Sequence, residues 1–253
     1  MGQRSKKKIS NRKLVDLNAQ WVVWAAFDSA GCRALQAVIA ENEVPHHSEI
    51  LRILFRTCAI QDLYKSRHAN FVLQTIVQNA PPFALQPMLF RLQGQVAAMC
   101  RHRRPVLGET CYATMGRRRG AFPMFPAWYG SRVAERIVEH ATNSHGERFF
   151  DELIRDIYDI ATSSFGNFVA QTFFEHNLQR RRECALALLP HASALSRTKG
   201  WFALQFSIRL CDADVQQMFA EQLRRENGRG ASNEPPADLA AAHAEQTFTM
   251  VTC

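Results

Sequence analysis

Apolar residues recur at helical spacing along most of this chain. The clearest segments are residues 21–29, 32–43, 49–64, 71–78, 132–141, 149–161 and 168–176. In each one, apolar side chains return every three or four residues, which is the period of an amphipathic helix. Pro45, Pro81, Pro82 and Pro190 fall between these segments, where proline favours a helix boundary. No alternating polar and apolar run with hairpin turns occurs, so the pattern predicts an all-α protein.

Five ten-residue segments within this pattern align without gaps. They are AGCRALQAVI (30–39), HANFVLQTIV (68–77), YGSRVAERIV (129–138), FGNFVAQTFF (165–174) and KGWFALQFSI (199–208). Their third positions are separated by 38, 61, 36 and 34 residues, so three of the separations lie near one period. The longer separation contains a basic stretch near 101–126, which indicates a loop inserted into the array. A helical unit of this length cannot bury its apolar face alone, whereas stacked units can, so the repeat predicts an α-solenoid.

Composition is compatible with a folded core and excludes several other classes of protein. The chain has 253 residues, of which 47% are hydrophobic and 21% charged, and this balance excludes wholesale disorder. No apolar run approaches the ~18 residues of a membrane helix, and MGQRSKKKIS lacks the apolar stretch of a secretory signal. The seven cysteines are scattered and never form a C-x-x-C pair, so we expect reduced thiols and no metal site.

The positive charge is concentrated in two places. The formal net charge is +8, with +6 in residues 1–13, +5 in residues 101–120 and −2 in residues 227–253. We therefore expect a basic N-terminal tail (1–13), a repeat domain (14–226) with a basic insert (101–126), and a Gly-, Pro- and Ala-rich flexible C-terminal tail (227–253). The basic segments would attract nucleic acid or an acidic partner; a solvated surface or a nuclear-import patch stays an open alternative for the tail.

The polar positions of the five segments carry the functional signal. The third, fourth and seventh residues fall within one quadrant of a helix, so stacking would align them along one concave face. The fourth residues are flat groups suited to stacking on bases: Arg33, Phe71, Arg132, Phe168 and Phe202. The candidate base-edge residues are Cys32 with Gln36, Asn70 with Gln74, Ser131 with Glu135, and Asn167 with Gln171. A carboxylate only accepts hydrogen bonds and suits the two donors of guanine, whereas an amide suits uracil or adenine.

The segments GCRALQ, ANFVLQ, GSRVAE and GNFVAQ resemble the Pumilio/FBF (PUF) family, over roughly residues 14–226. The resemblance implies a right-handed α-solenoid of three-helix repeats, in which each repeat recognises one RNA base through two edge residues and one stacking residue. By the family's code, Cys/Gln implies adenine, Asn/Gln uracil and Ser/Glu guanine. The family binds RNA antiparallel to its repeats, so the implied element is 5′-UGUA-3′.

The resemblance is to the last four of the family's eight repeats, followed by a terminal capping repeat at KGWFALQ. Trp201 is then expected to pack beneath the fourth repeat. The chain departs from the family in having about half of its repeats, and Trp21, Val22, Trp24 and Phe27 form an apolar stripe that is expected to be exposed or covered by residues 1–20 or a partner. The basic insert has no family counterpart; its Arg117, Arg118 and Arg119 are candidate phosphate contacts, with a protein contact or a passive role as alternatives.

Nothing in the sequence favours an enzyme. The G-x-S-x-G elbow, the H-E-x-x-H zinc motif, the Walker loop and the dinucleotide-binding glycine motif do not occur. Asp151, Glu152, Asp156 and Asp159 crowd one predicted helix, where we expect a solvated acidic face. We therefore expect no catalytic residue, no cofactor and no small-molecule substrate.

The resemblance implies a protein that binds single-stranded mRNA at UGUA elements in 3′ untranslated regions. It would act with protein co-regulators to lower translation or mRNA stability. This role implies a cytoplasmic location, and the basic tail also admits the nucleus. Two alternatives stay open: a PUF-like nucleolar factor that binds ribosomal RNA, and an α-solenoid scaffold that binds protein.

Overall fold

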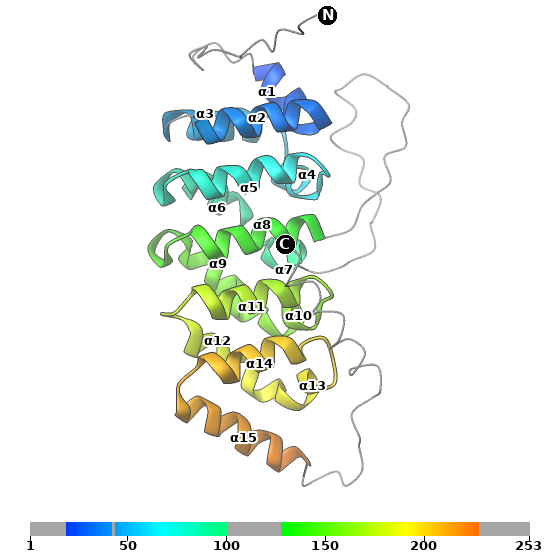
Figure 1. The fold of residues 1–253 in the computed structure, drawn as a ribbon, viewed down its shortest axis with the longest axis vertical. Helices are drawn as coiled ribbons and strands as arrows, with labels where there is room; N and C mark the ends of the chain where they lie inside the picture. The colour runs from blue at the N-terminus through cyan, green and yellow to red at the C-terminus, as the bar shows by residue number, and fades with distance from the viewer. Residues whose placement is uncertain (1–18, 42–43, 101–127, 228–253) are drawn as a thin grey trace, which may run out of the picture.

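The structure is a computed structural model that describes residues 19–41, 44–100 and 128–227, and these residues form a stack of helices (Figure 1). The helices fall into five successive three-helix units. The first unit is α1 (Ala19–Phe27), α2 (Ser29–Glu41) and α3 (Val44–Thr57); the second is α4 (Ile60–Lys65), α5 (Ala69–Asn79) and α6 (Gln86–Leu92), with the 3-10 turn η2 (Pro82–Leu85) before α6. The third is α7 (Val96–Cys100), α8 (Trp128–His140) and α9 (Asn143–Arg155); the fourth is α10 (Ile157–Thr162), α11 (Gly166–His176) and α12 (Arg181–Leu188). The fifth is α13 (Ala192–Ser196), preceded by the 3-10 turn η3 (Leu189–His191), then α14 (Trp201–Leu210) and α15 (Ala213–Asn227).

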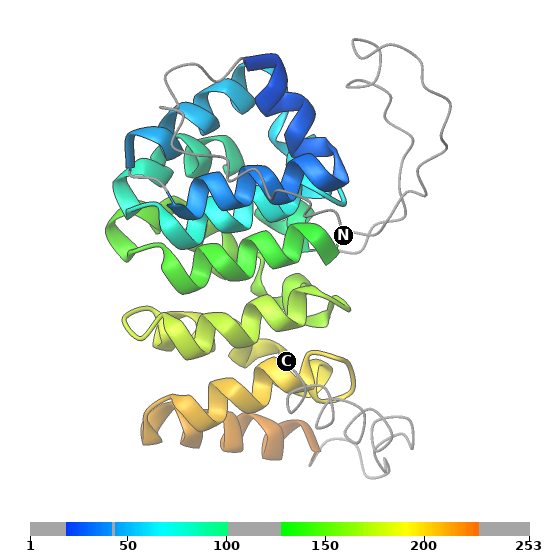
Figure 2. The same cartoon turned by 45° about the horizontal axis from the view of Figure 1, so that its top comes forward.

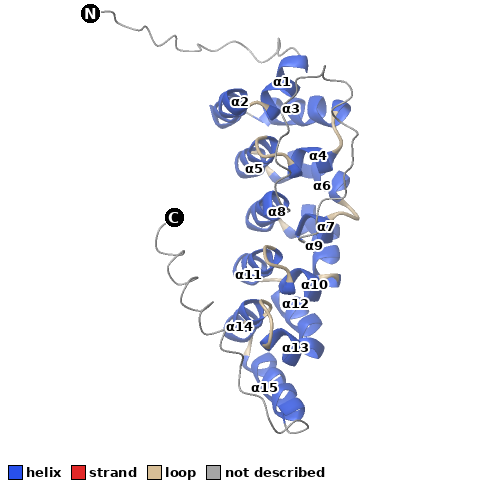
Figure 3. Ribbon diagram, turned by 90° about the vertical axis from the view of Figure 1, so that its right-hand side faces the viewer, coloured by secondary structure: helices blue, strands red, loops and turns tan. Residues whose placement is uncertain are grey.

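The middle helices of the units form one layer of the molecule. Helix α2 packs on α5, α5 on α8, α8 on α11 and α11 on α14, and they run roughly parallel to one another (Figures 1 and 2). Figure 3 shows these five inner helices in one column and the other helices in a second column, with the stack bowed so that the inner helices lie on its concave side. The predicted α-solenoid of three-helix repeats is therefore confirmed, and all five aligned segments contribute the inner helices.

The small residue at the second position of each segment marks a close contact between helices. A Cβ atom placed on Gly166 would lie 2.4 Å from the carbonyl oxygen of Ile160 in α10 and 3.0 Å from that of Cys100 in α7. A Cβ atom on Gly130 would similarly lie 2.8 Å from the carbonyl oxygen of Met99 in α7. The first helix of a unit thus crosses directly over the start of the inner helix, and a larger side chain would force the two apart.

The basic insert falls inside the third unit, between α7 and α8. The two helices nevertheless pack against each other, and α7 also contacts α9 and α10. The hydroxyl group of Ser163 donates a hydrogen bond of 2.8 Å to the carbonyl oxygen of Cys100, the last residue of α7. Residues 101–127, with the candidate phosphate contacts Arg117, Arg118 and Arg119, lie outside the described residues, as do residues 1–13.

Three expectations about individual segments need correction. The stripe in α1 is only partly exposed, because Val22 is buried and Trp21 and Phe27 pack against the core, while Trp24 is 51% exposed. The four acidic residues do not share one helix, since Asp156 lies at the junction of α9 and α10 and Asp159 lies in α10. Glu152 is buried rather than solvated, because its carboxylate accepts hydrogen bonds from backbone N–H groups near α7. The expected C-terminal tail, apart from Asn227 at the end of α15, lies outside the described residues.

No single helix in the described ranges has both the length and the apolar character needed to cross a membrane. The bent pair α1 and α2 meets the criterion only when both helices are taken together, across a bend of 116°. A grouping of three or more His, Cys, Asp or Glu side chains able to hold a metal ion is also lacking among the described residues.

Candidate nucleic-acid interface

The residues predicted to contact bases occupy equivalent places on the five inner helices. We call the third, fourth and seventh positions of the aligned segments the recognition face. Third-position side chains are buried except for the half-buried Trp201, and fourth-position side chains are exposed or half-buried. Seventh-position side chains are buried or half-buried. The third positions are Cys32, Asn70, Ser131, Asn167 and Trp201, the fourth are Arg33, Phe71, Arg132, Phe168 and Phe202, and the seventh are Gln36, Gln74, Glu135, Gln171 and Gln205.

The two Asn/Gln pairs have the same internal hydrogen-bond pattern. Asn70 is fully buried, and its Nδ2 donates to the carbonyl oxygens of Ser66 (2.7 Å) and Arg67 (3.1 Å). Its Oδ1 accepts a hydrogen bond of 2.7 Å from Nε2 of Gln74. The asparagine amide is therefore occupied within the protein, and it fixes the orientation of the glutamine amide that lies nearer the surface.

The second pair repeats this arrangement on α11. Asn167 donates to the carbonyl oxygens of Ser163 (3.1 Å) and Ser164 (2.9 Å), and its Oδ1 accepts from Nε2 of Gln171 at 2.9 Å. In both pairs the carbonyl acceptors belong to the turn just before the inner helix. The asparagine thus ties this turn to the inner helix as well as holding the glutamine.

The Cys32/Gln36 pair is held partly by the neighbouring unit. The thiol of Cys32 donates to the carbonyl oxygen of His68 over 3.0 Å, and burial raises the pKa of this thiol. Nε2 of Gln36 donates to Sγ of Cys32 at 3.1 Å, while its Oε1 accepts from the hydroxyl group of Thr75 on α5 at 3.3 Å. Sequence reasoning missed Thr75, because its contact with Gln36 crosses between units and follows from no spacing within one helix.

The Ser131/Glu135 pair contains the one carboxylate of the recognition face. Glu135 is only 8% exposed, and burial is the main effect on its carboxyl group, raising its pKa. Nη1 of Arg132 donates to Oε2 of Glu135 at 2.8 Å and opposes that rise. The guanidinium carbon of Arg132 lies 6.0 Å from the centre of the Phe168 ring on the next inner helix. The spacing of Arg132 and Glu135, three residues apart, was available from the sequence as a signal for this pair.

The flat side chains remain accessible enough to contact a ligand. Phe71 is 45% exposed and Arg33 is exposed, while Phe168 and Phe202 are half-buried. Trp201 is partly buried and packs against the core, as expected for a residue of a capping unit. The recognition face therefore offers flat groups at the surface with polar groups of fixed orientation beside them.

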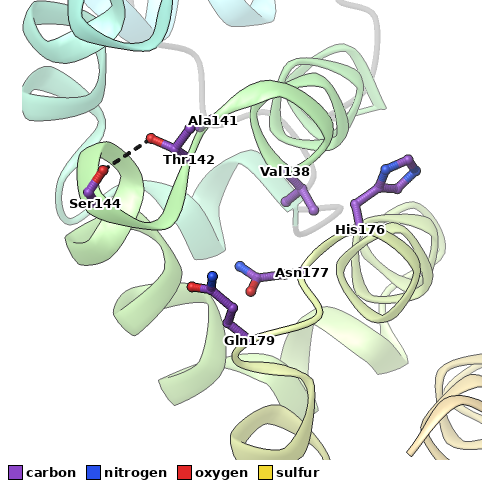
Figure 4. A pocket seen from close by; sticks show the side chains of 7 residues that line it. All are labelled: Val138, Ala141, Thr142, Ser144, His176, Asn177 and Gln179. Atoms are coloured by element: carbon purple, nitrogen blue, oxygen red, sulfur yellow. Dashed lines mark hydrogen bonds between the residues drawn. The ribbon is translucent and has the colours of Figure 1, made fainter.

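A separate pocket of about 430 Å³ lies at the C-terminal ends of α8 and α11 (Figure 4). Its lining consists of Val138, Ala141, Thr142, Ser144, His176, Asn177 and Gln179. None of these residues belongs to the recognition face, so the pocket is not part of the predicted base-contacting surface.

Comparison with known proteins gives a family match for part of the chain. The family described as "Pumilio-family RNA binding repeat" matches residues 129–154 and 156–184. These segments cover α8 with nearly all of α9 and most of the fourth unit, and they include the Ser131/Glu135 and Asn167/Gln171 pairs. The resemblance to the Pumilio/FBF family is thus confirmed in these two repeats.

Solved structures extend the likeness in fold to about four-fifths of the chain. PUF-8 in complex with PBE-RNA is 18% identical, with a TM-score of 0.64, and the match covers 81% of this chain and 53% of that one. The Puf4 RNA-binding domain bound to the HO endonuclease RNA 3′ UTR recognition sequence is 19% identical, with a TM-score of 0.64, over 83% of this chain and 58% of that one. The RNA-binding domain of yeast Puf5p bound to SMX2 RNA is 13% identical, with a TM-score of 0.59, over 80% of this chain and 52% of that one.

These structures establish the fold, including the predicted PUF-type α-solenoid. This chain spans about half the length of the domains it matches. The matched family is one of binding repeats rather than enzymes, which agrees with the expectation of a non-enzymatic protein.

Proposed function

We propose that this chain binds single-stranded RNA in a sequence-specific manner through the recognition face. The observation that carries the proposal is the recurrence of an amide or a carboxylate, held in a fixed orientation, at the same place on four consecutive inner helices. Each one lies beside a flat side chain on which a base can stack. The match to Pumilio-family repeats supports the same conclusion.

The proposed element is 5′-UGUA-3′, bound antiparallel to the units. Gln171 and Gln74 would contact the two uracils, Glu135 the guanine and Gln36 the adenine, and the buried Asn167 and Asn70 would hold their glutamines in place beneath the bases. The buried carboxylate of Glu135 favours guanine, because guanine presents two adjacent donors to an acceptor-only group. Arg33, Phe71, Arg132, Phe168 and Phe202 would stack on the bases.

We further propose mRNA 3′ untranslated regions as targets, with repression of translation or mRNA stability through protein co-regulators in the cytoplasm. Support comes from the solved Puf4 and Puf3 domains, which were bound to 3′ UTR recognition sequences. A ribosomal-RNA factor that recognises structured RNA would have no use for edge groups held in this way. A protein-binding scaffold would likewise not need them.

The central test replaces Glu135 with glutamine and measures RNA binding by fluorescence anisotropy. Labelled RNAs containing UGUA, UAUA or UCUA are titrated at one fixed salt concentration. The wild-type chain is expected to prefer UGUA, and Glu135→Gln is expected to move the preference toward UAUA. A correctly matched base edge is worth ~1–3 kcal/mol, so the ratio of the two dissociation constants should change by about tenfold or more.

A matched control is Glu139→Gln, on the same helix one turn further along, where the carboxylate pairs with Arg136. This variant should keep the wild-type preference for UGUA. Equal binding of all three RNAs by the wild-type chain would overturn base recognition and leave only non-specific attraction. Absence of RNA binding would favour the scaffold alternative.

A further inference from the structure

Three residues of the recognition face form a cluster where the third and fourth units meet. Arg132 and Glu135 lie one turn apart on α8 and are joined by the 2.8 Å hydrogen bond described above. Phe168 on α11 lies next to the guanidinium group of Arg132, at 6.0 Å from its central carbon. The Arg132 side chain is half-exposed and the Glu135 side chain is buried, so the guanidinium lies on the solvent side of the carboxylate. A ligand that binds the Oε2 atom of Glu135 must therefore displace or share the hydrogen bond from Arg132.

The guanidinium group resembles the Watson–Crick edge of guanine in its hydrogen bonding. Both are planar, and both direct adjacent N–H donors at a carboxylate. A guanidinium also stacks favourably on an aromatic ring, as a base does. In the unbound protein, Arg132 donates to Oε2 of Glu135 one hydrogen bond of the kind that a bound guanine would donate.

No other unit in the described part of the chain shows this contact between its stacking residue and its seventh-position residue. Phe71, Phe168 and Phe202 have no hydrogen-bond donor in the side chain. The other stacking arginine, Arg33, lies three residues before Gln36 on α2. The Gln36 amide, however, makes its hydrogen bonds to Cys32 and Thr75. The contact is therefore a property of the guanine position and does not follow from having arginine as a stacking residue.

We propose that Arg132 is a specificity-determining residue: it holds the Glu135 carboxylate in the unbound protein and yields its place only to a base that offers equivalent donors. This inference rests on the proposed function. Guanine replaces the lost hydrogen bond when it displaces the guanidinium, whereas adenine or a pyrimidine leaves a buried carboxylate poorly paired. The displaced guanidinium remains beside Phe168, where it can stack on the base.

The pH dependence of base preference distinguishes this role from stacking alone. Burial raises the pKa of Glu135 and Arg132 lowers it, so removal of Arg132 should raise it further. Guanine preference needs the carboxylate, which is present above the pKa and is lost as the pH falls through it. The other charged groups acting on Glu135 are Arg136 and Glu139, both on α8. Helix α5 carries no charged or titratable side chain, and those of α11 are Glu175 and His176 in its last turn.

The test compares Arg132→Tyr with Arg33→Tyr. Tyrosine keeps a flat stacking surface and removes the guanidinium donors, and Arg33 is the matched arginine that does not hold its neighbouring edge residue. The ratio of the UAUA to the UGUA dissociation constant is measured from about pH 5 to about pH 8. In Arg132→Tyr this ratio should fall by up to about tenfold per pH unit below the raised pKa of Glu135. In the wild type and in Arg33→Tyr the ratio should stay constant to a lower pH before it falls, because Glu135 keeps its lower pKa.

An Arg132→Tyr profile identical to the wild type would overturn the proposal. A second measurement is independent of RNA: the carboxyl carbon resonance of Glu135 is titrated in the RNA-free protein. A higher pKa in Arg132→Tyr than in the wild type supports the holding role, and an equal pKa overturns it. If the wild-type chain shows no preference for UGUA, the proposed function fails, and this titration still decides whether Arg132 holds Glu135.

Displacement has its own signature in the guanidinium N–H resonances of Arg132. They should shift on binding UGUA RNA and move much less on binding UAUA RNA. Equal shifts with both RNAs would contradict selective displacement. Circular dichroism confirms that each variant is folded, and Arg132→Gln replaces Arg132→Tyr if the tyrosine variant is not.

Discussion

Buried asparagines on the recognition face orient a neighbouring glutamine side chain. Asn167 is 1% exposed and uses its whole amide inside the protein, on two backbone carbonyls and on Gln171. Because Oδ1 of Asn167 accepts from Gln171, the glutamine keeps one orientation without RNA. Preorganisation of this kind lowers the entropy lost when a base binds.

Replacing Asn167 with alanine should therefore affect both stability and binding. The two carbonyl oxygens lose their side-chain donor and Gln171 loses its acceptor, so the free energy of unfolding in urea should fall by about 1–2 kcal/mol. Affinity for UGUA RNA should also weaken several-fold, because the proposed site for the 5′ uracil is this pair. Asn79→Ala is the control, since Asn79 makes a similar bond to the carbonyl oxygen of Thr75 at an exposed site. Equal losses in both variants would contradict the holding role of Asn167.

At the scale of helices, the sequence predicted the inner layer better than the outer one. The five aligned segments begin at most two residues before α2, α5, α8, α11 and α14 and otherwise lie within them, because these helices are long enough to show their apolar period. The first helices of the second to fifth units contain only five or six residues each, which is too short for a period to be recognised. Their positions depend on contacts across units, and such contacts leave no mark on local sequence.

The candidate site was likewise predictable in its residues but not in its internal bonds. Spacing identified Gln36, Gln74, Glu135 and Gln171 as one series. The bonds that orient them depend partly on neighbouring units, as with Thr75 and Gln36. Glu152 was wrongly expected to be solvated for the same reason. Only the packing of α9 against α7 makes a buried carboxylate at that position favourable.

Glu152 fixes the start of α7 from a helix in the same unit. Its Oε2 accepts from the backbone N–H of Gly94 at 2.7 Å, and its Oε1 accepts from that of Val96 at 3.0 Å. Gly94 has φ of +76°, a conformation that side chains other than glycine rarely adopt. The carboxylate therefore stabilises this turn by accepting hydrogen bonds from the backbone N–H groups of Gly94 and Val96.

Glu152→Ala should lower the free energy of unfolding by about 2–3 kcal/mol, because charge-assisted bonds to buried backbone groups are lost. Thermal or urea unfolding followed by circular dichroism measures this change. The preceding residue supplies the control: Asp151 is exposed and pairs with Arg180 at 2.6 Å, so Asp151→Ala should cost less than about 1 kcal/mol. A small effect for Glu152→Ala would show that water molecules accept hydrogen bonds from the two N–H groups when the carboxylate is absent.

For the molecule as a whole, base preference and overall attraction to RNA should come from different parts of the chain. The recognition face carries few charges, whereas most of the net positive charge lies in residues 1–13 and 101–120. Contacts to phosphates add affinity without regard to sequence, and they make binding sensitive to salt. The basic segments are thus expected to set the strength of RNA binding, and the inner helices its selectivity.

Replacing Arg117, Arg118 and Arg119 together with glutamine tests this division. Binding to UGUA and UCUA RNAs should weaken by the same factor, and the salt dependence of the association constant should become less steep. The ratio between the two RNAs should not change. Anisotropy titrations at several salt concentrations measure both quantities, and a changed ratio would mean that the insert takes part in base selection.

The place of the insert, between α7 and α8, makes the third unit a natural point for adding sequence. Helix α7 keeps its contacts with α8, α9 and α10 although 27 residues separate it from α8 along the chain. The entropy of closing a loop grows only with the logarithm of its length, by about 0.6 kcal/mol for each doubling. A fluorescent label or an effector domain placed there would leave the four pairs proposed to contact bases in register, so new activities can be joined to this array from within a repeat as well as at its ends.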